Sequence, residues 1–341
     1  MIKKPAAAFV IGLLLLAWWA MSSPGTNGGI AQAKESRAPA TTPSLSNGRA
    51  ALLPLPPVPA IGREKAALGE RLFFEKRLSR DNTISCASCH DPARGGTDRR
   101  PVSIGIDGHT GPINAPTVFN AALNFVQFWD GRAASLEEQA AGPVHNPLEM
   151  GANWALVISK LTNDESYRVA FAQLYPQGIT GETIADAIAA FEHTLLTPSR
   201  FDLFLAGNPH ALNKQEQDGY RRFLDYGCAS CHQGANIGGN MFQRFGVMAD
   251  YFAGRTPTAA DLGRFNVTQR EADRHVFKVP SLRNVALTAP YFHDASAQTL
   301  EEAIMIMGRV QLGRELTIPD TQAIAAFLKT LNGHWRGHPL P

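Results

Sequence analysis

Four cysteines and two histidines form a repeated motif that could carry chemistry. The stretch Cys86-Ala87-Ser88-Cys89-His90 returns unchanged as Cys228-Ala229-Ser230-Cys231-His232, and the two copies use all four cysteines of the 341-residue chain. Two thiols followed directly by a histidine are the attachment pattern of c-type haem, in which the thiols bind the vinyl groups and the histidine binds iron. A redox dithiol or half of a zinc site would also use a Cys-x-x-Cys pair. Because both copies carry the histidine, the sequence favours two covalently bound c-type haems.

Each haem iron has a second axial position, which a methionine could fill. The helix predicted from about Leu300 to Met307 carries two methionines. At about 100° per residue, Met307 shares the apolar face with Leu300 and Ile304, whereas Met305 lies on the polar face. We therefore regard Met307 as the better iron ligand, with an ordinary core methionine as the alternative. A Met/His ligand pair raises the reduction potential of a haem, as an electron-accepting centre requires.

Two further side chains could take part in redox chemistry. Glu149 lies beside apolar residues in Asn146-Pro147-Leu148-Glu149-Met150-Gly151 rather than in a charged run. A buried carboxylate near an open iron could move a proton during peroxide cleavage, although a solvated loop glutamate fits the pattern equally well. Trp129 could bridge two redox centres, or it could be a core aromatic residue whose N–H needs a partner. Hydrophobic periodicity does not distinguish these two roles.

Helices must position these residues, and the hydrophobic pattern predicts a mainly α architecture without a strong period-2 stretch. Asn213 and Glu216 predict a capping box for the helix that ends at Gly227, just before the second motif. Glycine-rich loops follow both motifs. We predict two cytochrome c-like domains, 63–198 and 199–341, each with one haem. The predicted helices span about 64–76, 136–141, 154–161, 166–175, 182–195, 213–227, 300–307 and 319–332.

The first residues have the pattern of an export signal. Lys3 and Lys4 precede an uncharged apolar run over 6–20, and Ala31-Gln32-Ala33 offers a cleavage site. We therefore predict a signal peptide at 1–33, cleaved or kept as an anchor, and a periplasmic location. A Pro/Ala-rich linker at 34–62, outside the core, follows it. The formal net charge of the whole chain is +2, which excludes a strongly basic nucleic-acid-binding protein and gives no clue to a partner's charge.

The combined motifs resemble the bacterial dihaem cytochrome c peroxidase family, over nearly the whole mature chain. The resemblance implies that His90 is the proximal ligand of a low-potential peroxidatic haem in the N-terminal domain. It implies that His232 and Met307 ligate a high-potential electron-entry haem in the C-terminal domain, with Trp129 between the haems. The most specific matching stretches are 111–117 (GPINAPT), 127–132 (QFWDGR), 138–143 (EQAAGP), 146–150 (NPLEM), 279–284 (VPSLRN), 289–294 (APYFHD) and Met307-Gly308.

The same resemblance implies the residues of two smaller sites. Gln139, Pro143 and Glu149 would line a peroxide pocket, in which Glu149 acts as the acid/base. The resemblance also implies a calcium ion between the domains. Oxygen ligands suit this ion. Its ligands would be the side chain of Asn114 and the carbonyls of Thr288 and Pro290.

One segment departs from the family pattern. Relatives carry a distal histidine directly after a Ser-Ile-Gly-like segment on a mobile loop, where it blocks the peroxidatic iron until the other haem is reduced. Here Ser103-Ile104-Gly105 is followed by Ile106, and the nearest histidine is His109. Either His109 takes the ligand role from a displaced position, or it is a solvated loop residue and the iron is open without reductive activation.

The resemblance implies reduction of hydrogen peroxide to water, with electrons from a small cytochrome c or copper protein. Relatives are often homodimers. Two rival functions stay open. A maturation enzyme on the same scaffold oxidises residues of a partner protein, but it has Tyr in place of the distal Met, so Met307 favours the peroxidase. A non-enzymatic dihaem electron carrier would need both irons six-coordinate and would have no use for Glu149.

Overall fold

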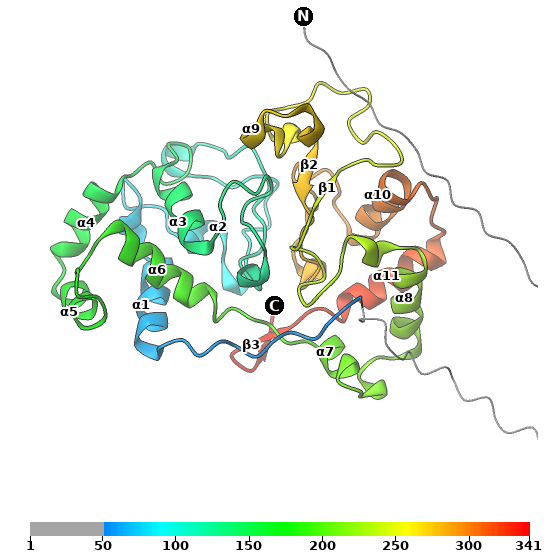
Figure 1. Cartoon of the computed structure of the whole chain (residues 1–341), viewed down its shortest axis with the longest axis horizontal. Helices are drawn as coiled ribbons and strands as arrows, with labels where there is room; N and C mark the ends of the chain where they lie inside the picture. The colour runs from blue at the N-terminus through cyan, green and yellow to red at the C-terminus, as the bar shows by residue number, and fades with distance from the viewer. Residues whose placement is uncertain (1–50) are drawn as a thin grey trace, which may run out of the picture. The chain divides into compact units, whose positions relative to one another are not determined.

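The computed structural model describes residues 51–341, so the predicted signal peptide and most of the predicted linker lie outside the described residues. Helices dominate and the strands are only two or three residues long (Figure 1), which confirms the mainly α prediction. None of the described helices is long and apolar enough to span a bilayer. The α-helices are α1 (Arg63–Phe73), α2 (Cys86–Cys89), α3 (Leu136–His145), α4 (Trp154–Thr162), α5 (Glu165–Leu174), α6 (Gly181–Glu192), α7 (Arg200–Leu205), α8 (Lys214–Asp225), α9 (Phe265–Thr268), α10 (Leu300–Leu312) and α11 (Ile318–Lys329).

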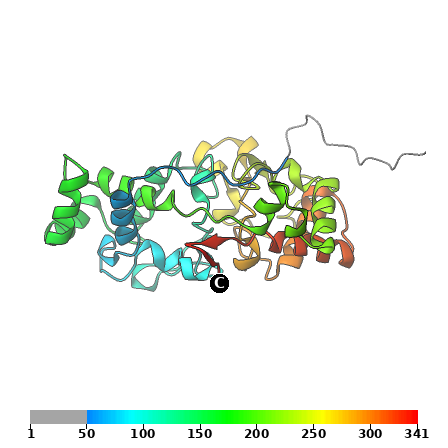
Figure 2. The same cartoon turned by 90° about the horizontal axis from the view of Figure 1, so that it is seen from below.

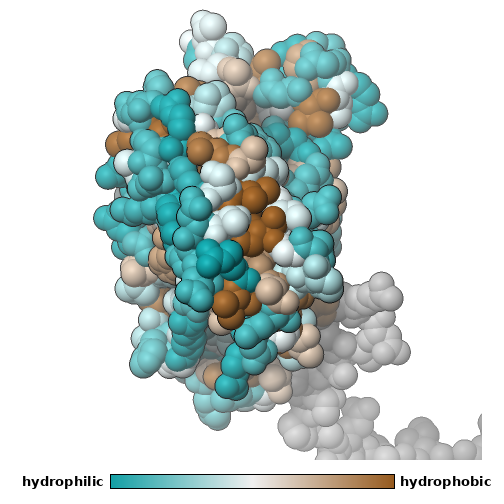
Figure 3. Space-filling view, turned by 90° about the vertical axis from the view of Figure 1, so that its left-hand side faces the viewer, coloured by the Kyte–Doolittle hydropathy of each residue, from teal (hydrophilic) through white to brown (hydrophobic). Residues whose placement is uncertain are grey.

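Two large hydrophobic clusters organise residues 51–341. The first lies between Leu68 and Leu195 and packs α1 and α3–α6 around Cys86 and Ala87 of the first motif. The second packs α7, α8, α10 and α11 around Cys228 and Ala229 of the second motif. Each motif thus has its own apolar surroundings. Figure 3 shows the side of the first cluster that carries α4 and α5, where hydrophilic residues cover most of the surface and a small hydrophobic area lies among them.

The same close helix crossing occurs in both clusters. Gly69 of α1 faces Ala187 of α6, and a Cβ atom added at Gly69 would lie 1.8 Å from the Ala187 carbonyl oxygen. Gly219 of α8 faces Ala323 of α11, where the corresponding distance is also 1.8 Å. Only glycine allows two helix backbones to approach so closely. The internal repeat seen in the haem motifs therefore extends to the helix pair that supports each motif.

Local signals explain most helix ends. Asn213 Oδ1 accepts from the Glu216 backbone N–H at 2.9 Å, and a Glu216 carboxylate oxygen accepts from Asn213 N–H at 2.8 Å, which confirms the predicted capping box. Two helices continue beyond the predicted range. α3 runs through Pro143, since a proline in a last turn costs only one hydrogen bond. α10 extends because the buried Val310 continues its apolar face.

The strands form two antiparallel pairs within the described part of the chain. β1 (Phe242–Arg244) pairs with β2 (Val276–Lys278), with Phe242 opposite Lys278. β3 (His334–Trp335) pairs with β4 (His338–Pro339) near the C-terminus. The period-2 pattern did not reveal these strands because each is too short to show alternation.

Both ends of the described chain cross to the other half. Residues 51–62 run from the second cluster toward α1 (Figure 2), and Leu52, only 1% exposed, belongs to the second cluster. The expectation that the whole predicted linker lies outside the core is therefore wrong for Leu52, because Leu53 N–H donates to the Gly234 carbonyl and holds it there. At the other end of the chain, Trp335 and Leu340 of the C-terminal tail pack on the first cluster.

Candidate functional site

The second haem motif opens onto a cavity of about 570 Å³. Cys228, Cys231 and His232 line it, and α10 contributes Met307 from another wall. Met305 of the same helix is 44% exposed. The predicted helix faces of the two methionines are thus confirmed, and the structure brings Met307 and His232 to one cavity.

His232 has the state that iron ligation requires. Burial lowers the pKa of His232 to about 4, and the carbonyls of Ile237 and Pro280 oppose this decrease. The ring is therefore neutral at pH 7, which is the form that binds a metal. Although these carbonyls lie near the ring, the buried Nδ1 makes no hydrogen bond of normal geometry with any described residue. Paired thiols, a neutral imidazole and an apolar cavity together fit a covalently bound haem.

The first motif is positioned by a short capped helix. Ser85 N–H donates to Ser88 Oγ at 2.9 Å and so closes the capping box of α2. The ring of His90 donates from Nδ1 to the Pro116 carbonyl at 2.9 Å. This bond fixes the tautomer and leaves Nε2 as the free ligand atom. Burial lowers the pKa of His90, so this ring is also neutral and suited to bind iron.

Glu149 lies close to the first motif. Burial raises the pKa of Glu149, while the Asn146 amide and the Arg132 charge oppose this increase. Asn146 Nδ2 donates to Glu149 Oε1 at 2.6 Å. Burial raises the pKa of the Cys89 thiol, and the negative charge of Glu149 adds to that increase. Glu149 is therefore a partly desolvated carboxyl group within electrostatic reach of the motif, rather than a fully solvated loop residue.

Helix α3 and the turn that carries Glu149 form one unit. Gln139 and Pro143 lie one helical turn apart, so they share a face of α3, and both are half-buried. The turn is tied to this helix because Met150 N–H donates to the Pro143 carbonyl at 3.2 Å. Pro143 also has no N–H to offer the Gln139 carbonyl. The predicted pocket residues thus come from one helix and the turn that follows it.

His109 belongs to a small hairpin over residues 103–111. Gly105 N–H donates to the His109 carbonyl at 2.8 Å, and Ile106 N–H donates to the Glu149 carbonyl at 2.9 Å. The side chain of His109 is exposed. The hairpin is therefore fastened to the Glu149 turn while His109 faces solvent, a geometry that fits the solvated-loop alternative.

Trp129 is held by hydrogen bonds and aromatic packing beside the second motif. Its indole Nε1 donates to the Asn114 carbonyl at 2.9 Å, so the polar atom has the partner that a core tryptophan needs. Trp129 lines the cavity of the second motif, and so does Pro116, whose carbonyl binds His90. The ring packs edge-on against Phe277, 6.4 Å between centroids. Trp129 is thus a packed aromatic residue that lines the cavity of the second motif.

The residues predicted to bind calcium line this same cavity. Asn114, Thr288 and Pro290 are all part of its wall. The Asn114 side chain donates through Nδ2 to the Arg100 carbonyl at 2.9 Å, which turns its Oδ1 away from that bond. The three candidate ligands are neutral oxygens, which suits a hard cation.

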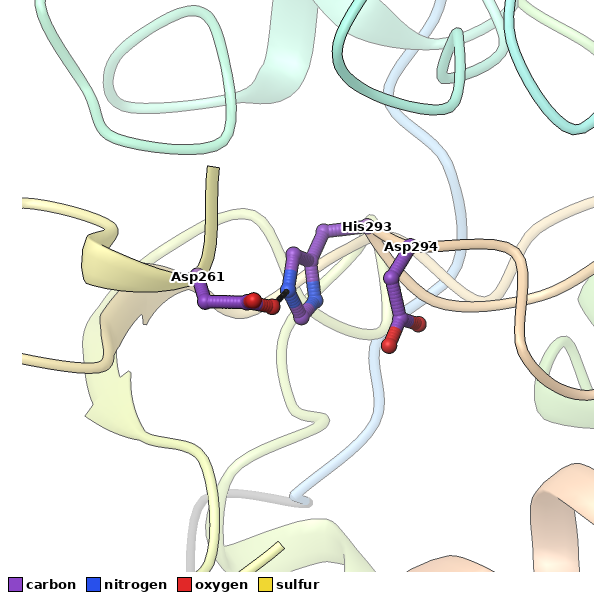
Figure 4. Close-up of side chains that lie close together, drawn as sticks. All are labelled: Asp261, His293 and Asp294. Carbon is purple, nitrogen blue, oxygen red and sulfur yellow. Dashed lines mark hydrogen bonds and ion pairs between the residues drawn. The ribbon is translucent and has the colours of Figure 1, made fainter. Parts of the chain in front are cut away.

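Sequence reasoning missed a buried acid–histidine cluster. Asp261 and Asp294 lie on either side of the His293 ring (Figure 4), and Asp261 Oδ1 accepts from His293 Nε2 at 2.8 Å. Arg255 forms ion pairs with Asp261 at 3.0 Å and with Asp294 at 2.8 Å. Because Arg255 already supplies the positive charge, we interpret the cluster as an ion-pair network. Nothing in the sequence links Asp261 to the distant His293.

Two haem-attachment motifs in separate helical clusters, with Met307 near one and Glu149 near the other, define a dihaem oxidoreductase. Residues 63–210 match the family model described as di-haem cytochrome c peroxidase. The chain is 50% identical over 285 residues to cytochrome c peroxidase Ccp of Escherichia coli, a match that covers 82% of this chain and 61% of that protein.

Two further comparisons agree with this class. The chain is 47% identical over 293 residues to the cytochrome c551 peroxidase of Nitrosomonas europaea, a match that covers 84% of this chain and 86% of that protein. The crystal structure of a MauG-like protein associated with microbial copper homeostasis superposes with a TM-score of 0.73 and 32% identity, covering 82% of this chain and 92% of that one. The chain belongs to the di-haem cytochrome c peroxidase family, which places it among the peroxidase oxidoreductases.

Proposed function

We propose that this chain reduces hydrogen peroxide to water, with electrons from a small cytochrome c or copper protein. The observation that carries the proposal is the difference between the two motif surroundings. His232 shares its cavity with Met307, which suits a six-coordinate electron-entry centre. His90 instead has the partly desolvated Glu149 nearby. The peroxidase names of the relatives from E. coli and N. europaea support the same activity.

The residues of each motif would hold one haem. Cys86 and Cys89 would bind the first and Cys228 and Cys231 the second, with His90 and His232 as the iron ligands. Bound haem supplies the electron storage and the O–O cleavage chemistry that no side chain here provides. The neutral state of both histidines, which follows from their lowered pKa values, prepares them to bind iron without first losing a proton.

Glu149 performs the proton transfer in this proposal. A carboxyl group whose pKa is raised by burial exchanges protons near neutral pH more readily than a solvated one. Glu149 takes the proton from one peroxide oxygen and returns it to the departing oxygen. Its bond to Asn146 orients the carboxylate, while Gln139 and Pro143 shape the pocket and Gln139 positions the substrate. A non-enzymatic electron carrier would have no use for such a carboxyl group.

Trp129 and Met307 take part in electron transfer in this proposal. Met307 and His232 would hold the iron of the electron-entry haem, and a thioether ligand would favour its reduced state. Trp129 would carry electrons between the two haems. Its carbonyl and its indole N–H both bind backbone groups, which supports the fixed position that this role needs. Met307 also argues against the maturation-type function, because those enzymes carry Tyr at the distal position.

We further propose the following arrangement of the whole protein. Residues 1–33 are the signal peptide of a periplasmic protein, and 63–198 and 199–341 are the peroxidatic and electron-transfer domains. A calcium ion lies between them, bound by the Asn114 side chain and the carbonyls of Thr288 and Pro290. The working form is a homodimer. Elemental analysis of the purified protein tests calcium directly, and less than one ion per chain would refute that site.

His109 does not gate the peroxidatic iron in this proposal, because its side chain faces solvent and its hairpin is fastened to the Glu149 turn. The EPR spectrum of the fully oxidised protein tests this directly. We expect a high-spin, five-coordinate haem before any reduction. A spectrum with two low-spin haems would show that a sixth ligand, with His109 the first candidate, closes the site.

The assay that separates the three functions measures steady-state peroxide consumption with a reduced small cytochrome as the donor. We expect donor oxidation in step with peroxide loss, two electrons for each peroxide. Donor oxidation without peroxide consumption would indicate an electron carrier. Peroxide-dependent oxidation of an added protein, without turnover of the small donor, would instead indicate the maturation-type enzyme.

A further inference from the structure

Lys278 is a buried cation without an anion. It ends β2 and is only 6% exposed, and its Nζ makes no hydrogen bond or ion pair with any residue of the described range 51–341. Burial lowers the pKa of Lys278 to about 8. Arg283 shows the contrast, since it is fully buried but forms ion pairs with both carboxylate oxygens of Asp202, each at 2.9 Å.

Within the described part of the chain, the wall of the cavity offers no carboxylate that could pair with Lys278. Lys278 lines the cavity of the second haem motif together with His232 and Met307. Arg244 and Arg283 are also part of this wall, but Arg244 is exposed and Arg283 is paired with Asp202. No aspartate or glutamate of the described residues lines the cavity to pair with Lys278. An isolated buried charge is costly unless it is paired. An occupant that brings its own negative charge would therefore pair with Lys278.

The backbone of Lys278 is held in place by hydrogen bonds. Lys278 N–H donates to the Trp129 carbonyl at 2.8 Å, and the Trp129 indole donates to the Asn114 carbonyl at 2.9 Å. Lys278 is also paired with Phe242 across the two-stranded sheet. These bonds fix the backbone of Lys278 beside the Trp129 carbonyl, at the wall of the cavity. Rigid placement is what a charge-assisted hydrogen bond to a carboxylate needs.

We propose that Lys278 forms an ion pair with a propionate of the haem attached at Cys228 and Cys231. This inference rests on the proposed haem content, because the propionates are the only anionic groups that a c-type haem brings into the cavity. The pair would tie that propionate to the strand whose Lys278 N–H binds the Trp129 carbonyl. It also cancels a negative charge near the second iron, which favours the reduced state and raises the reduction potential of that haem. Lys278 is thus a positioning residue for the electron-entry centre.

The test compares variants of the protein carrying both haems. Lys278→Met keeps the length of the side chain without its charge, and Lys278→Arg keeps the charge. Lys329→Met is the matched control, since Lys329 is exposed on α11 away from the cavity. We expect a lower midpoint potential of the second haem in Lys278→Met by spectroelectrochemical titration, and potentials close to wild type in the other two. An unchanged potential in Lys278→Met with both haems retained would overturn the proposal.

A second readout does not depend on the variants folding. The propionate bending mode in the resonance Raman spectrum of the wild-type protein should shift when H₂O is replaced by D₂O, because the lysine donates an exchangeable proton. In Lys278→Met this shift should be lost. A wild-type spectrum without any shift would refute the ion pair even if Lys278→Met failed to accumulate. Haem content from the pyridine haemochrome and peroxide turnover are measured separately, so loss of activity with two haems present would count against the proposed function alone.

Discussion

At the scale of single residues, two carboxyl groups near the first motif differ in burial and in hydrogen bonding. Glu149 is half-buried and bonded to Asn146, which keeps it reactive. Glu192 of α6 is 5% exposed, and its Oε2 has no hydrogen-bond partner among the described residues. Only the first has a geometry suited to proton exchange with a substrate, so the two should respond differently to replacement by the neutral amide.

Glu149→Gln should lower peroxide turnover by about 10²- to 10⁴-fold, the usual contribution of general acid–base catalysis. Both haems should remain bound, because Glu149 belongs to neither attachment motif. The measurement is kcat with a reduced donor cytochrome, together with the haem spectrum. Glu165→Gln, an exposed position on α5 in the same cluster, is the control and should behave as wild type. Near-normal turnover in Glu149→Gln would refute the acid/base role.

Glu192→Gln should stabilise the protein, and more so at higher pH. Burial, with a smaller effect of Glu137, raises the pKa of Glu192 from 4.5 to about 8. Between these values the folded form holds a proton that the unfolded form releases, so this group lowers the free energy of unfolding as pH rises. The variant should gain on the order of 3 kcal/mol at pH 7 and little at pH 4.5. Denaturant titrations at pH 5 and pH 8 measure this, and an equal difference at both would contradict the assignment.

At the scale of elements, the two clusters depend on glycines at helix crossings. Gly219→Ala would gain about 1 kcal/mol from helix propensity. The added Cβ, however, would lie 1.8 Å from the Ala323 carbonyl oxygen, which forces α8 and α11 apart. Overpacking of this kind costs about 1–3 kcal/mol or more, and we expect it to outweigh the propensity gain.

The net effect of Gly219→Ala should therefore be a loss of about 1–2 kcal/mol in the free energy of unfolding, measured by denaturant titration. Lys214→Ala, an exposed position in the first turn of α8, is the control and should change little. A Gly219→Ala variant as stable as wild type would mean that the helices separate without cost.

How much of these elements the sequence could predict depends on how local their signals are. The capping box at Asn213 and the apolar face of α10 were predictable because residues within one or two turns determine them. The hydrogen bond between Asp261 and His293 joins residues far apart in the chain, and Lys278 lies on a strand too short to show alternation. Neither had a local signal. The family resemblance, rather than periodicity, was what singled out Gln139 and Pro143.

At the scale of the whole molecule, the two ends of the described chain tie its halves together. The N-terminal arm holds Leu52 in the second cluster, and the C-terminal hairpin places Trp335 against Phe119, 5.8 Å between ring centroids. Phe119 lines the cavity of the second motif and belongs to the first cluster. The C-terminal hairpin therefore supports the same region through which Trp129 would connect the haems.

Trp335→Ala tests whether this contact stabilises the molecule. Trp335 is half-buried and also lies beneath the Arg336 guanidinium, 4.4 Å from its ring centroid. Removing it should lower the free energy of unfolding by about 2 kcal/mol, less than for a fully buried tryptophan. It should also speed amide hydrogen exchange around Phe119, as mass spectrometry of the intact protein can show. His338→Ala, exposed on β4, should leave both unchanged. Faster exchange confined to the hairpin itself would show that the tail packs on the first cluster without supporting it.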